Sequence, residues 1–419
     1  MSSLPLTSLA YALLQASRID TAVFGGQSLA DGLLGRVDPV ARPAVQDLVY
    51  GSLRAYGRGD FFLSRLLQRP LDSDEVRALL LVAIYRLETR PDAAHTVVDQ
   101  AVSAAGEVAG GNFRALVNGV LRNFLRQQAS LTAALAADPV ASAMHPDWWL
   151  ARLHAAYPQD WEGIVAAGNL PPPMGLRVNT RRVSRDDYIM KLAAAGIAAR
   201  PTGECGLALD KPVPVDALPG FADGLVSVQD PGAQLAAALL DPAPGSRVLD
   251  ACAAPGGKTA HLLERAEIDL LALDLKPSRC RRIAETLSRL GLSAEIQDAD
   301  CAKPATWWDG RPFDAVLADV PCTASGVVRR NPDAKWLRRE ADIASFSGAQ
   351  ARILDALWQV VRPGGKLLYV TCSVFPAENG EQIGRFLARQ PQAHRCHEEQ
   401  LLPNAEHDGF FYCLLEKRA

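Results

Sequence analysis

Apolar residues recur at helical spacing through the first third of the chain. From residue 4 to about 130, stretches such as residues 61–67 and 76–87 place their apolar side chains on one helical face, with few strand patterns between them. Asp72-Ser73-Asp74-Glu75 has the composition of a capped helix start, and Arg90-Pro91 would end that helix. A further helix is expected from about Phe113 to Arg126. The pattern predicts an all-helical domain.

The pattern breaks around Asp138-Pro139 and His145-Pro146, which predicts a linker near 130–145. From Leu176 onward, short β-branched runs mix with a helical stretch over residues 184–195 that Gly196 would end. We therefore expect a helical domain over residues 1–140 and a small α/β module with its linker over residues 141–235.

From Arg247 onward, strand and helix patterns alternate strictly. Such alternation predicts an α/β fold with a doubly wound, mostly parallel sheet, and we assign it to residues 236–419. Ligands of these sheets bind at the carboxyl ends of the strands. The expected strands are residues 248–250, 270–274, 294–297, 315–319 and 366–371.

A glycine-containing turn, Ala253-Ala254-Pro255-Gly256-Gly257, follows the first of these strands. Such a turn lets the backbone approach a ligand and presents helix N-terminal amides to it. The next strand ends in Asp274, about 18 residues after Gly256, where a carboxylate can accept hydrogen bonds from ribose hydroxyls. A nicotinamide dinucleotide site is the rival interpretation, but G-x-G-x-x-G is absent and Pro255 occupies the turn.

Composition narrows the classes of partner. The net charge of −3 and the pI near 6.2 are not those of a strongly basic protein, so any contact with nucleic acid must come from local basic clusters. Such clusters lie at residues 177–185, 279–282 and 329–339.

Eight cysteines without a C-x-x-C pair predict no disulfide framework and no metal site. His394-Arg395-Cys396-His397 is interpreted as a surface loop. With no secretory leader and no apolar run long enough to span a membrane, we expect a cytoplasmic protein.

Two cysteines end strands that lie far apart in the sequence. Cys322 ends Ala318-Asp319-Val320-Pro321-Cys322, and Cys372 lies in Tyr369-Val370-Thr371-Cys372-Ser373. A cofactor turn combined with two such thiols indicates methyl transfer to a pyrimidine. Thiolate attack at C6 of cytosine makes C5 nucleophilic toward a sulfonium methyl group.

Five short motifs follow one another in a specific order along the second half of the chain. They are residues 252–259, Asp319-Val320-Pro321-Cys322, residues 331–336, Thr371-Cys372-Ser373 and Pro376-Ala377-Glu378-Asn379. With these motifs the chain resembles the RNA cytosine-5 methyltransferases of the Sun/Fmu (RsmB) type over nearly its whole length. The segment Phe113 to Asn123 also resembles the NusB-like RNA-binding domain of this subfamily. Val320 stands where the family usually has Ala, and Ala299-Asp300-Cys301 replaces a more common Gly-Asp-Gly.

The resemblance implies S-adenosyl-L-methionine as cofactor and a cytosine of small-subunit ribosomal RNA, unassembled or partly assembled, as substrate. It implies no obligate protein partner. Cys372 would be the nucleophile, Cys322 would assist its release, and Asp319 would hold the pyrimidine edge. Lys258 would either lower a thiol pKa or orient Asp319. The implied cofactor residues are Cys252, Ala253, Ala254, Pro255, Gly256, Gly257, Lys258, Asp274, Asp300 and Asp319.

Two other functions fit part of the pattern. A DNA cytosine-5 methyltransferase would use the Pro-Cys thiol, Cys322, as nucleophile, but Cys372 and the absence of a large target-recognition insertion argue against it. A non-catalytic RNA-binding factor would explain the helical domain alone. The intact glycine-containing turn and both thiols argue against this second alternative.

Overall fold

The computed structural model describes residues 3–418, and the chain forms two compact units. The first unit contains the chain up to Leu170 together with the segment Val328–Arg339. The second contains Pro171–Val327 and the chain from Glu340 onward. The division therefore falls near residue 170, because two helices that follow the expected linker group with the first unit.

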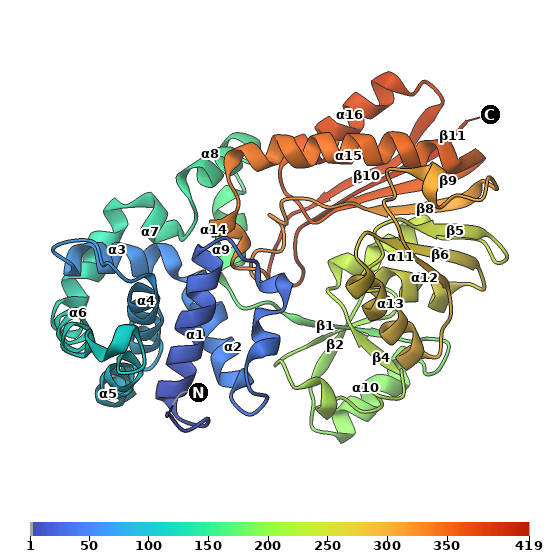
Figure 1. Ribbon diagram of the computed structural model, residues 1–419. Helices are drawn as coiled ribbons and strands as arrows, with labels where there is room; N and C mark the ends of the chain where they lie inside the picture. Colours follow the sequence, from blue (N-terminus) through green and yellow to red (C-terminus); the bar gives the residue numbers. More distant parts are fainter. Residues whose placement is uncertain (1–2, 419) are drawn as a thin grey trace. The chain divides into compact units, whose positions relative to one another are not determined.

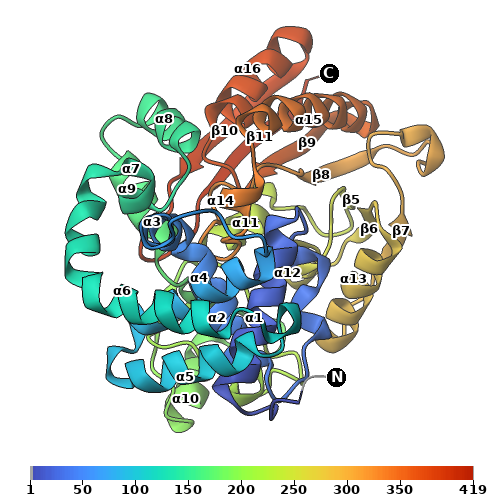
Figure 2. The same ribbon diagram turned by 60° about the vertical axis from the view of Figure 1, so that its left-hand side comes forward.

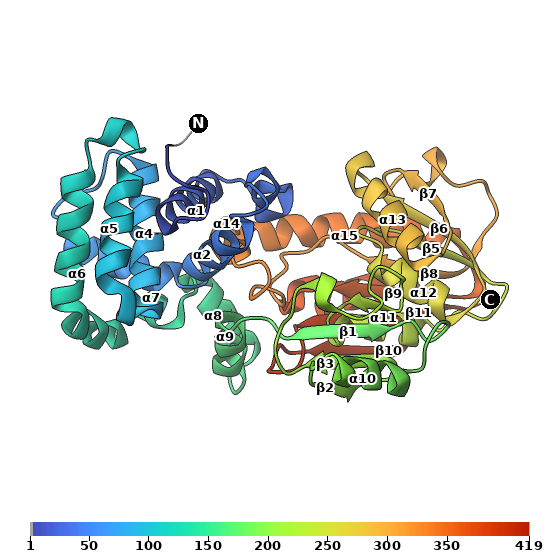
Figure 3. The same cartoon turned by 90° about the horizontal axis from the view of Figure 1, so that it is seen from below.

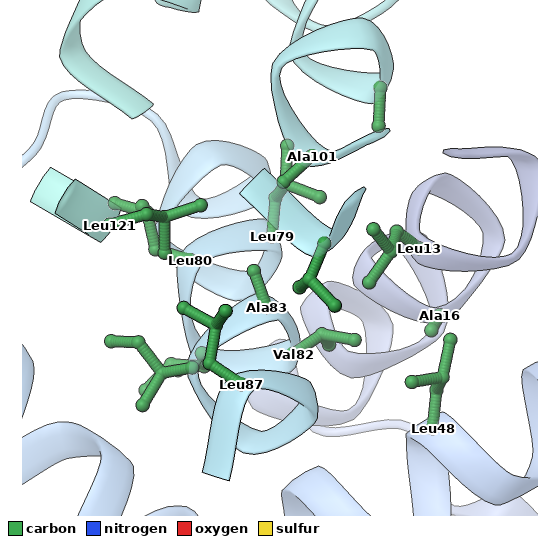
Figure 4. Close-up of a cluster of buried hydrophobic side chains, with 14 of the residues drawn as sticks. Leu13, Ala16, Leu48, Leu79, Leu80, Val82, Ala83, Leu87, Ala101 and Leu121 are labelled. Atoms are coloured by element: carbon green, nitrogen blue, oxygen red, sulfur yellow. The ribbon is translucent and has the colours of Figure 1, made fainter. Parts of the chain in front are cut away.

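The first unit is helical, and α4 is its central helix (Figure 2). Nearly every residue of α4 from Val76 to Ile84 is buried, and the helix packs against α1, α2, α5 and α6. Figure 4 shows Leu79, Val82 and Ala83 of α4 among apolar side chains of these neighbours. The helices are α1 (Leu9–Phe24), α2 (Arg42–Arg54), α3 (Tyr56–Leu66), α4 (Asp74–Thr89), α5 (Ala94–Ala105), α6 (Arg114–Ala134), α7 (Pro139–Ala143), α8 (Asp147–Ala156), α9 (Trp161–Asn169) and α14 (Ala334–Leu337).

The expected limits of α4 are confirmed. The Ser73 side chain accepts a hydrogen bond from the amide of Val76 at 3.4 Å, and the helix ends before Arg90-Pro91. Helix α6 runs to Ala134, eight residues beyond the expected end at Arg126. Its apolar face continues through Leu131, and no proline occurs before Pro139.

The segment 328–339 packs within the helical unit. Trp336 donates from Nε1 to the carbonyl of Leu53 at 2.7 Å, and Asp333 accepts from the amide of Leu29 at 3.0 Å. Arg329 and Lys335 are buried. The interpretation of residues 329–339 as a basic surface cluster is therefore wrong for these two cations, because they belong to the interior of the unit.

The second unit begins with a small antiparallel sheet in the order β2-β3-β1-β4, with α10 (Arg185–Ala194) packed on it (Figure 3). Its strands are β1 (Met174–Val178), β2 (Ala199–Thr202), β3 (Gly206–Leu209) and β4 (Val226–Val228). Arg177 of β1 is 1% exposed and donates twice to Glu264 at 2.8 Å. Arg177 therefore forms a buried structural ion pair with Glu264. It is not part of a basic surface, contrary to the expectation for residues 177–185.

A seven-stranded sheet in the order β10-β11-β9-β8-β5-β6-β7 forms the rest of the second unit. Pairings from β9 through β7 are parallel, whereas β11 pairs antiparallel with both β9 and β10. The mostly parallel sheet is confirmed. The strands are β5 (Arg247–Asp250), β6 (Asp269–Asp274), β7 (Glu295–Asp298), β8 (Phe313–Asp319), β9 (Val361–Thr371), β10 (Ala393–Leu401) and β11 (Phe410–Lys417).

Strands β10 and β11 are not in the sequence-based assignment. His394-Arg395-Cys396-His397 lies in β10, so its interpretation as a loop is wrong. The strand is at the sheet edge and none of its residues is buried, so its sequence lacks the alternating apolar pattern that identifies a strand. Within residues 3–418, no group of three or more His, Cys, Asp or Glu side chains could hold a metal ion.

Helices cover both faces of the large sheet (Figure 1). One face carries α15 (Glu340–Val360) and α16 (Gly380–Arg389), and the other carries α11 (Leu235–Leu240), α12 (Gly257–Arg265) and α13 (Pro277–Leu290). A separate apolar core fills each side. In the described part of the chain, no helix is both long and apolar enough to cross a lipid bilayer.

Candidate active site

The predicted cofactor turn connects β5 to α12 and is held by backbone and side-chain contacts. The amide of Ala253 donates to the carbonyl of Leu273 at 2.8 Å, and the amide of Ala254 donates to Asp274 Oδ2 at 3.2 Å. Thr286 donates to the carbonyl of Pro255 at 2.9 Å. The turn is therefore fixed against β6 and α13, with the N-terminal amides of α12 beside it.

Gly256 is the residue before α12 and has a φ of +95°. A Cβ atom at this position would lie 3.1 Å from the Cα of Ile283. Both the positive φ and the close approach to α13 require glycine here.

Two predicted cofactor carboxylates lie at neighbouring strand ends. Asp274 ends β6 and is 3% exposed. Its Oδ2 atom forms an ion pair with the Arg279 guanidinium at 3.3 Å and accepts the hydrogen bond from the amide of Ala254. Asp300 follows β7, accepts from the amide of Ala302 at 3.1 Å and is more open to solvent. Asp274 thus supports the turn itself, whereas Asp300 lies on the adjacent loop.

Two cysteines meet in this region. The Sγ atom of Cys252, in the turn, lies 3.8 Å from the Sγ atom of Cys301, which follows Asp300. Cys301, like Ala299, stands where the family more commonly has glycine. It fills a buried position against the cofactor turn.

Asp250 is a further candidate for the cofactor site that was not predicted from the sequence. It ends β5, accepts from Thr259 Oγ1 at 2.7 Å, and its Oδ1 atom has no hydrogen-bond partner among the described residues. Burial raises the pKa of this carboxyl to about 7. The unpaired, buried oxygen beside the turn is suited to a donor on a bound cofactor, and the position of Asp250 at a strand end was the available signal.

The two thiols predicted to act together are adjacent. Cys322 follows β8 and Cys372 follows β9, and their Sγ atoms lie 3.3 Å apart. The loop after Cys322 folds back so that the amide of Gly326 donates to the carbonyl of Cys372 at 2.8 Å. Two residues fifty positions apart therefore form one dithiol centre.

The dithiol centre is asymmetric. The adjacent Cys372 sulfur and burial raise the pKa of the Cys322 thiol well above its usual range. Cys322 is 7% exposed, whereas Cys372 is more accessible. Cys322 is consequently held as a thiol, and Cys372 is the better placed to meet a substrate.

Lys258 follows the cofactor turn and forms an ion pair with Asp319, which lies three residues before Cys322. It lies in the first turn of α12, and its Nζ atom donates to Asp319 Oδ2 at 2.7 Å. Burial lowers the pKa of Lys258, but the Asp319 carboxylate, Cys372 and Asp250 together outweigh burial, and the pKa of Lys258 is raised. Of the two roles considered for Lys258, this contact supports orientation of Asp319.

Comparison with known proteins finds three matched regions along the chain. Residues 237–416 match the family 16S rRNA methyltransferase RsmB/F, residues 145–216 match a ferredoxin-like domain of RsmF/B-like methyltransferases, and residues 17–126 match the NusB family. The last match agrees with the predicted NusB-like domain.

Full-length relatives and solved structures extend these matches. "Ribosomal RNA small subunit methyltransferase B" of Pseudomonas putida is 44% identical over 97% of this chain and 98% of its own. The Vibrio cholerae protein of the same name is 41% identical over 96% of each chain. A methyltransferase homologue from Pyrococcus horikoshii superposes with a TM-score of 0.60 at 28% identity, covering 67% of this chain and 98% of its own. PH0851 shares the fold over 99% of this chain and all of its own, with a TM-score of 0.83 at 24% identity.

Proposed function

Because the chain belongs to the 16S rRNA methyltransferase RsmB/F family, we propose that it methylates C5 of a cytosine in 16S rRNA, cytosine 967 by its resemblance to the RsmB type. The donor of this family is S-adenosyl-L-methionine. The 3.3 Å separation of the Cys322 and Cys372 sulfur atoms carries the proposal, since C5 methylation through a covalent adduct needs one thiol to attack and a second group to complete the reaction.

The residues around the turn fit the cofactor. Asp250 offers an unpaired carboxylate oxygen, and the α12 amides and Asp274 line the same strand ends. When bound, S-adenosyl-L-methionine supplies an electrophilic methyl group. The residues assigned to hold it are Cys252, Ala253, Ala254, Pro255, Gly256, Gly257, Lys258, Asp274, Asp300 and Asp319.

The proposed roles of the thiols follow from their asymmetry. The Cys372 thiolate attacks C6, which moves electron density to C5, and Asp319 holds the N3/N4 edge where charge develops. Once Cys372 is bonded to carbon, the largest cause of the raised pKa of Cys322 is removed. Cys322 can then lose its proton to solvent and, as a thiolate, accept the C5 proton. The electrons of the C5–H bond form the C5–C6 double bond, the bond from Cys372 to C6 breaks, and Cys372 leaves as a thiolate.

We assign rRNA positioning to the helical unit. Arg114, Arg122 and Arg126 are exposed along α6, where they can contact phosphates without reading sequence. The expected partner is small-subunit rRNA before or during assembly.

The test is methylation of unmodified 16S rRNA with labelled S-adenosyl-L-methionine, followed by mapping of the labelled base. We expect 5-methylcytosine at one position, with free rRNA a better substrate than assembled subunits. Label in DNA, label on another base, or no label in any rRNA would contradict the proposal.

A further inference from the structure

A buried carboxylate connects the residues that follow the two thiols. Glu378, at the end of η9 (Pro376–Glu378), has no exposed surface. Its Oε1 atom accepts from the amide of Thr323 at 2.9 Å, and its Oε2 atom accepts from Thr323 Oγ1 at 2.5 Å and from Ser373 Oγ at 2.6 Å. Thr323 directly follows Cys322, and Ser373 directly follows Cys372.

The residues that precede the thiols join the same network. Gln350 of α15 donates from Nε2 both to Glu378 Oε1 and to the carbonyl of Pro321, each at 3.0 Å. Asn379 accepts from Thr371 Oγ1 at 2.6 Å and donates to the carbonyl of Ser373 at 2.8 Å. Both neighbours of each cysteine are therefore fixed by side chains that are themselves buried.

We propose that Glu378 is a positioning residue that sets the separation of the Cys322 and Cys372 sulfur atoms. It acts through Thr323 and Ser373 and is assigned no contact with RNA or cofactor. The catalytic consequence rests on the proposed two-thiol reaction. The geometric claim can be measured without any substrate.

The electrostatics agree with this role. Burial raises the pKa of Glu378, whereas its four donors favour the carboxylate. A carboxylate can accept from all four donors at once. A glutamine would turn one acceptor oxygen into an NH₂ group. In the Oε1 position this group would face the Thr323 amide, which can only donate, and in the Oε2 position it would require the hydroxyls of Thr323 and Ser373 to reverse their direction. Glu378→Gln should therefore disrupt the network while nearly keeping the side-chain volume.

The first measurement is the equilibrium between the dithiol and a Cys322–Cys372 disulfide in glutathione buffers, read by mass spectrometry of the linked peptides. Oxidised glutathione accepts the two electrons and leaves as two reduced molecules, so the equilibrium reports the effective concentration of one thiol at the other. We expect this value to fall at least about tenfold in Glu378→Gln, which corresponds to roughly 30 mV.

The matched control is Gln382→Leu. Gln382 is also buried, and its Nε2 atom donates to the carbonyl of Ser347 rather than to a neighbour of either thiol. This variant should leave the disulfide equilibrium unchanged. An equal effect in both variants, or no effect in Glu378→Gln, would overturn the proposal.

If Glu378→Gln does not fold, Thr323→Val and Ser373→Ala decide the question, since each removes one hydroxyl donor to Glu378. Each should lower the effective thiol concentration, and wild-type values in both would overturn the proposal. In a folded Glu378→Gln enzyme, turnover should fall about a hundredfold with little change in KM for RNA. Lower thiol proximity with normal turnover would support the geometric role and reject the proposed two-thiol reaction instead.

Discussion

The Sγ atoms of Cys322 and Cys372 lie 3.3 Å apart because β8 and β9 are parallel neighbours and each thiol follows the carboxyl end of its strand. The same strand ends place Asp319 beside Lys258. Parallel pairing therefore assembles the proposed nucleophile, its assisting thiol and the base-binding carboxylate from segments that are distant in sequence.

Replacement of the proposed nucleophile should separate chemistry from binding. Cys372→Ala should abolish methylation and leave the affinity for S-adenosyl-L-methionine unchanged, because the thiol acts only on the bound base. Single-turnover assays and calorimetric titration measure the two effects. Retention of a tenth of wild-type turnover would mean that Cys372 is not the nucleophile.

Asp274 is expected to contribute to cofactor binding beyond its support of the turn. Asp274→Ala should weaken S-adenosyl-L-methionine binding by about 1–3 kcal/mol through lost charge-assisted hydrogen bonds. Asp274→Asn, which preserves the shape, should show part of the loss. Unchanged affinity in a calorimetric titration of the alanine variant would remove Asp274 from the cofactor site.

Lys258→Met should distinguish the two roles considered for this lysine. If Lys258 orients Asp319, turnover falls about a hundredfold. The pH midpoint for alkylation of Cys372, followed by mass spectrometry of its peptide, then stays at the wild-type value. A midpoint that moves to higher pH would show that Lys258 lowers the thiol pKa instead.

Lys335 should make the stability of the helical unit depend on pH. Burial and the nearby Arg54 lower its pKa from 10.5 to about 7. Between these values the unfolded chain binds more protons than the folded one, so the free energy of unfolding should rise with pH, by at most about 1.4 kcal/mol per unit. Lys335→Met should flatten the slope from pH 7 to pH 9 in urea unfolding, and an unchanged slope would contradict the assignment.

Local patterns predicted most of the fold and identified the strand ends that carry the candidate site. Helical spacing and the Ser73 cap identified α4, and the buried runs ending in Asp274 and Asp319 identified β6 and β8. Residues that end parallel strands converge at one sheet edge. The sequence alone therefore places Cys322 and Cys372 at the same edge of the sheet.

The features that were missed depend on contacts between distant segments. The buried pair of Arg177 and Glu264 spans 87 residues, and no local pattern distinguishes that arginine from a surface cation. Segment 328–339 was assigned to the α/β domain from its place in the sequence, but it belongs to the helical unit, where Trp336 donates to the carbonyl of Leu53. Strand β10 was missed because an edge strand without buried residues carries no alternating apolar pattern.

The central claim is that the two thiols have separate duties, and Cys322→Ala tests it most directly. The variant retains the nucleophile and the cofactor site, so the adduct between Cys372 and C6 should form but should not resolve. The measurement is a denaturing gel of Cys322→Ala incubated with unmodified 16S rRNA and S-adenosyl-L-methionine. We predict a slowly migrating protein–RNA band that disappears when Cys372 is also replaced. No such band, with normal turnover by Cys322→Ala, would contradict the division of duties between the two thiols.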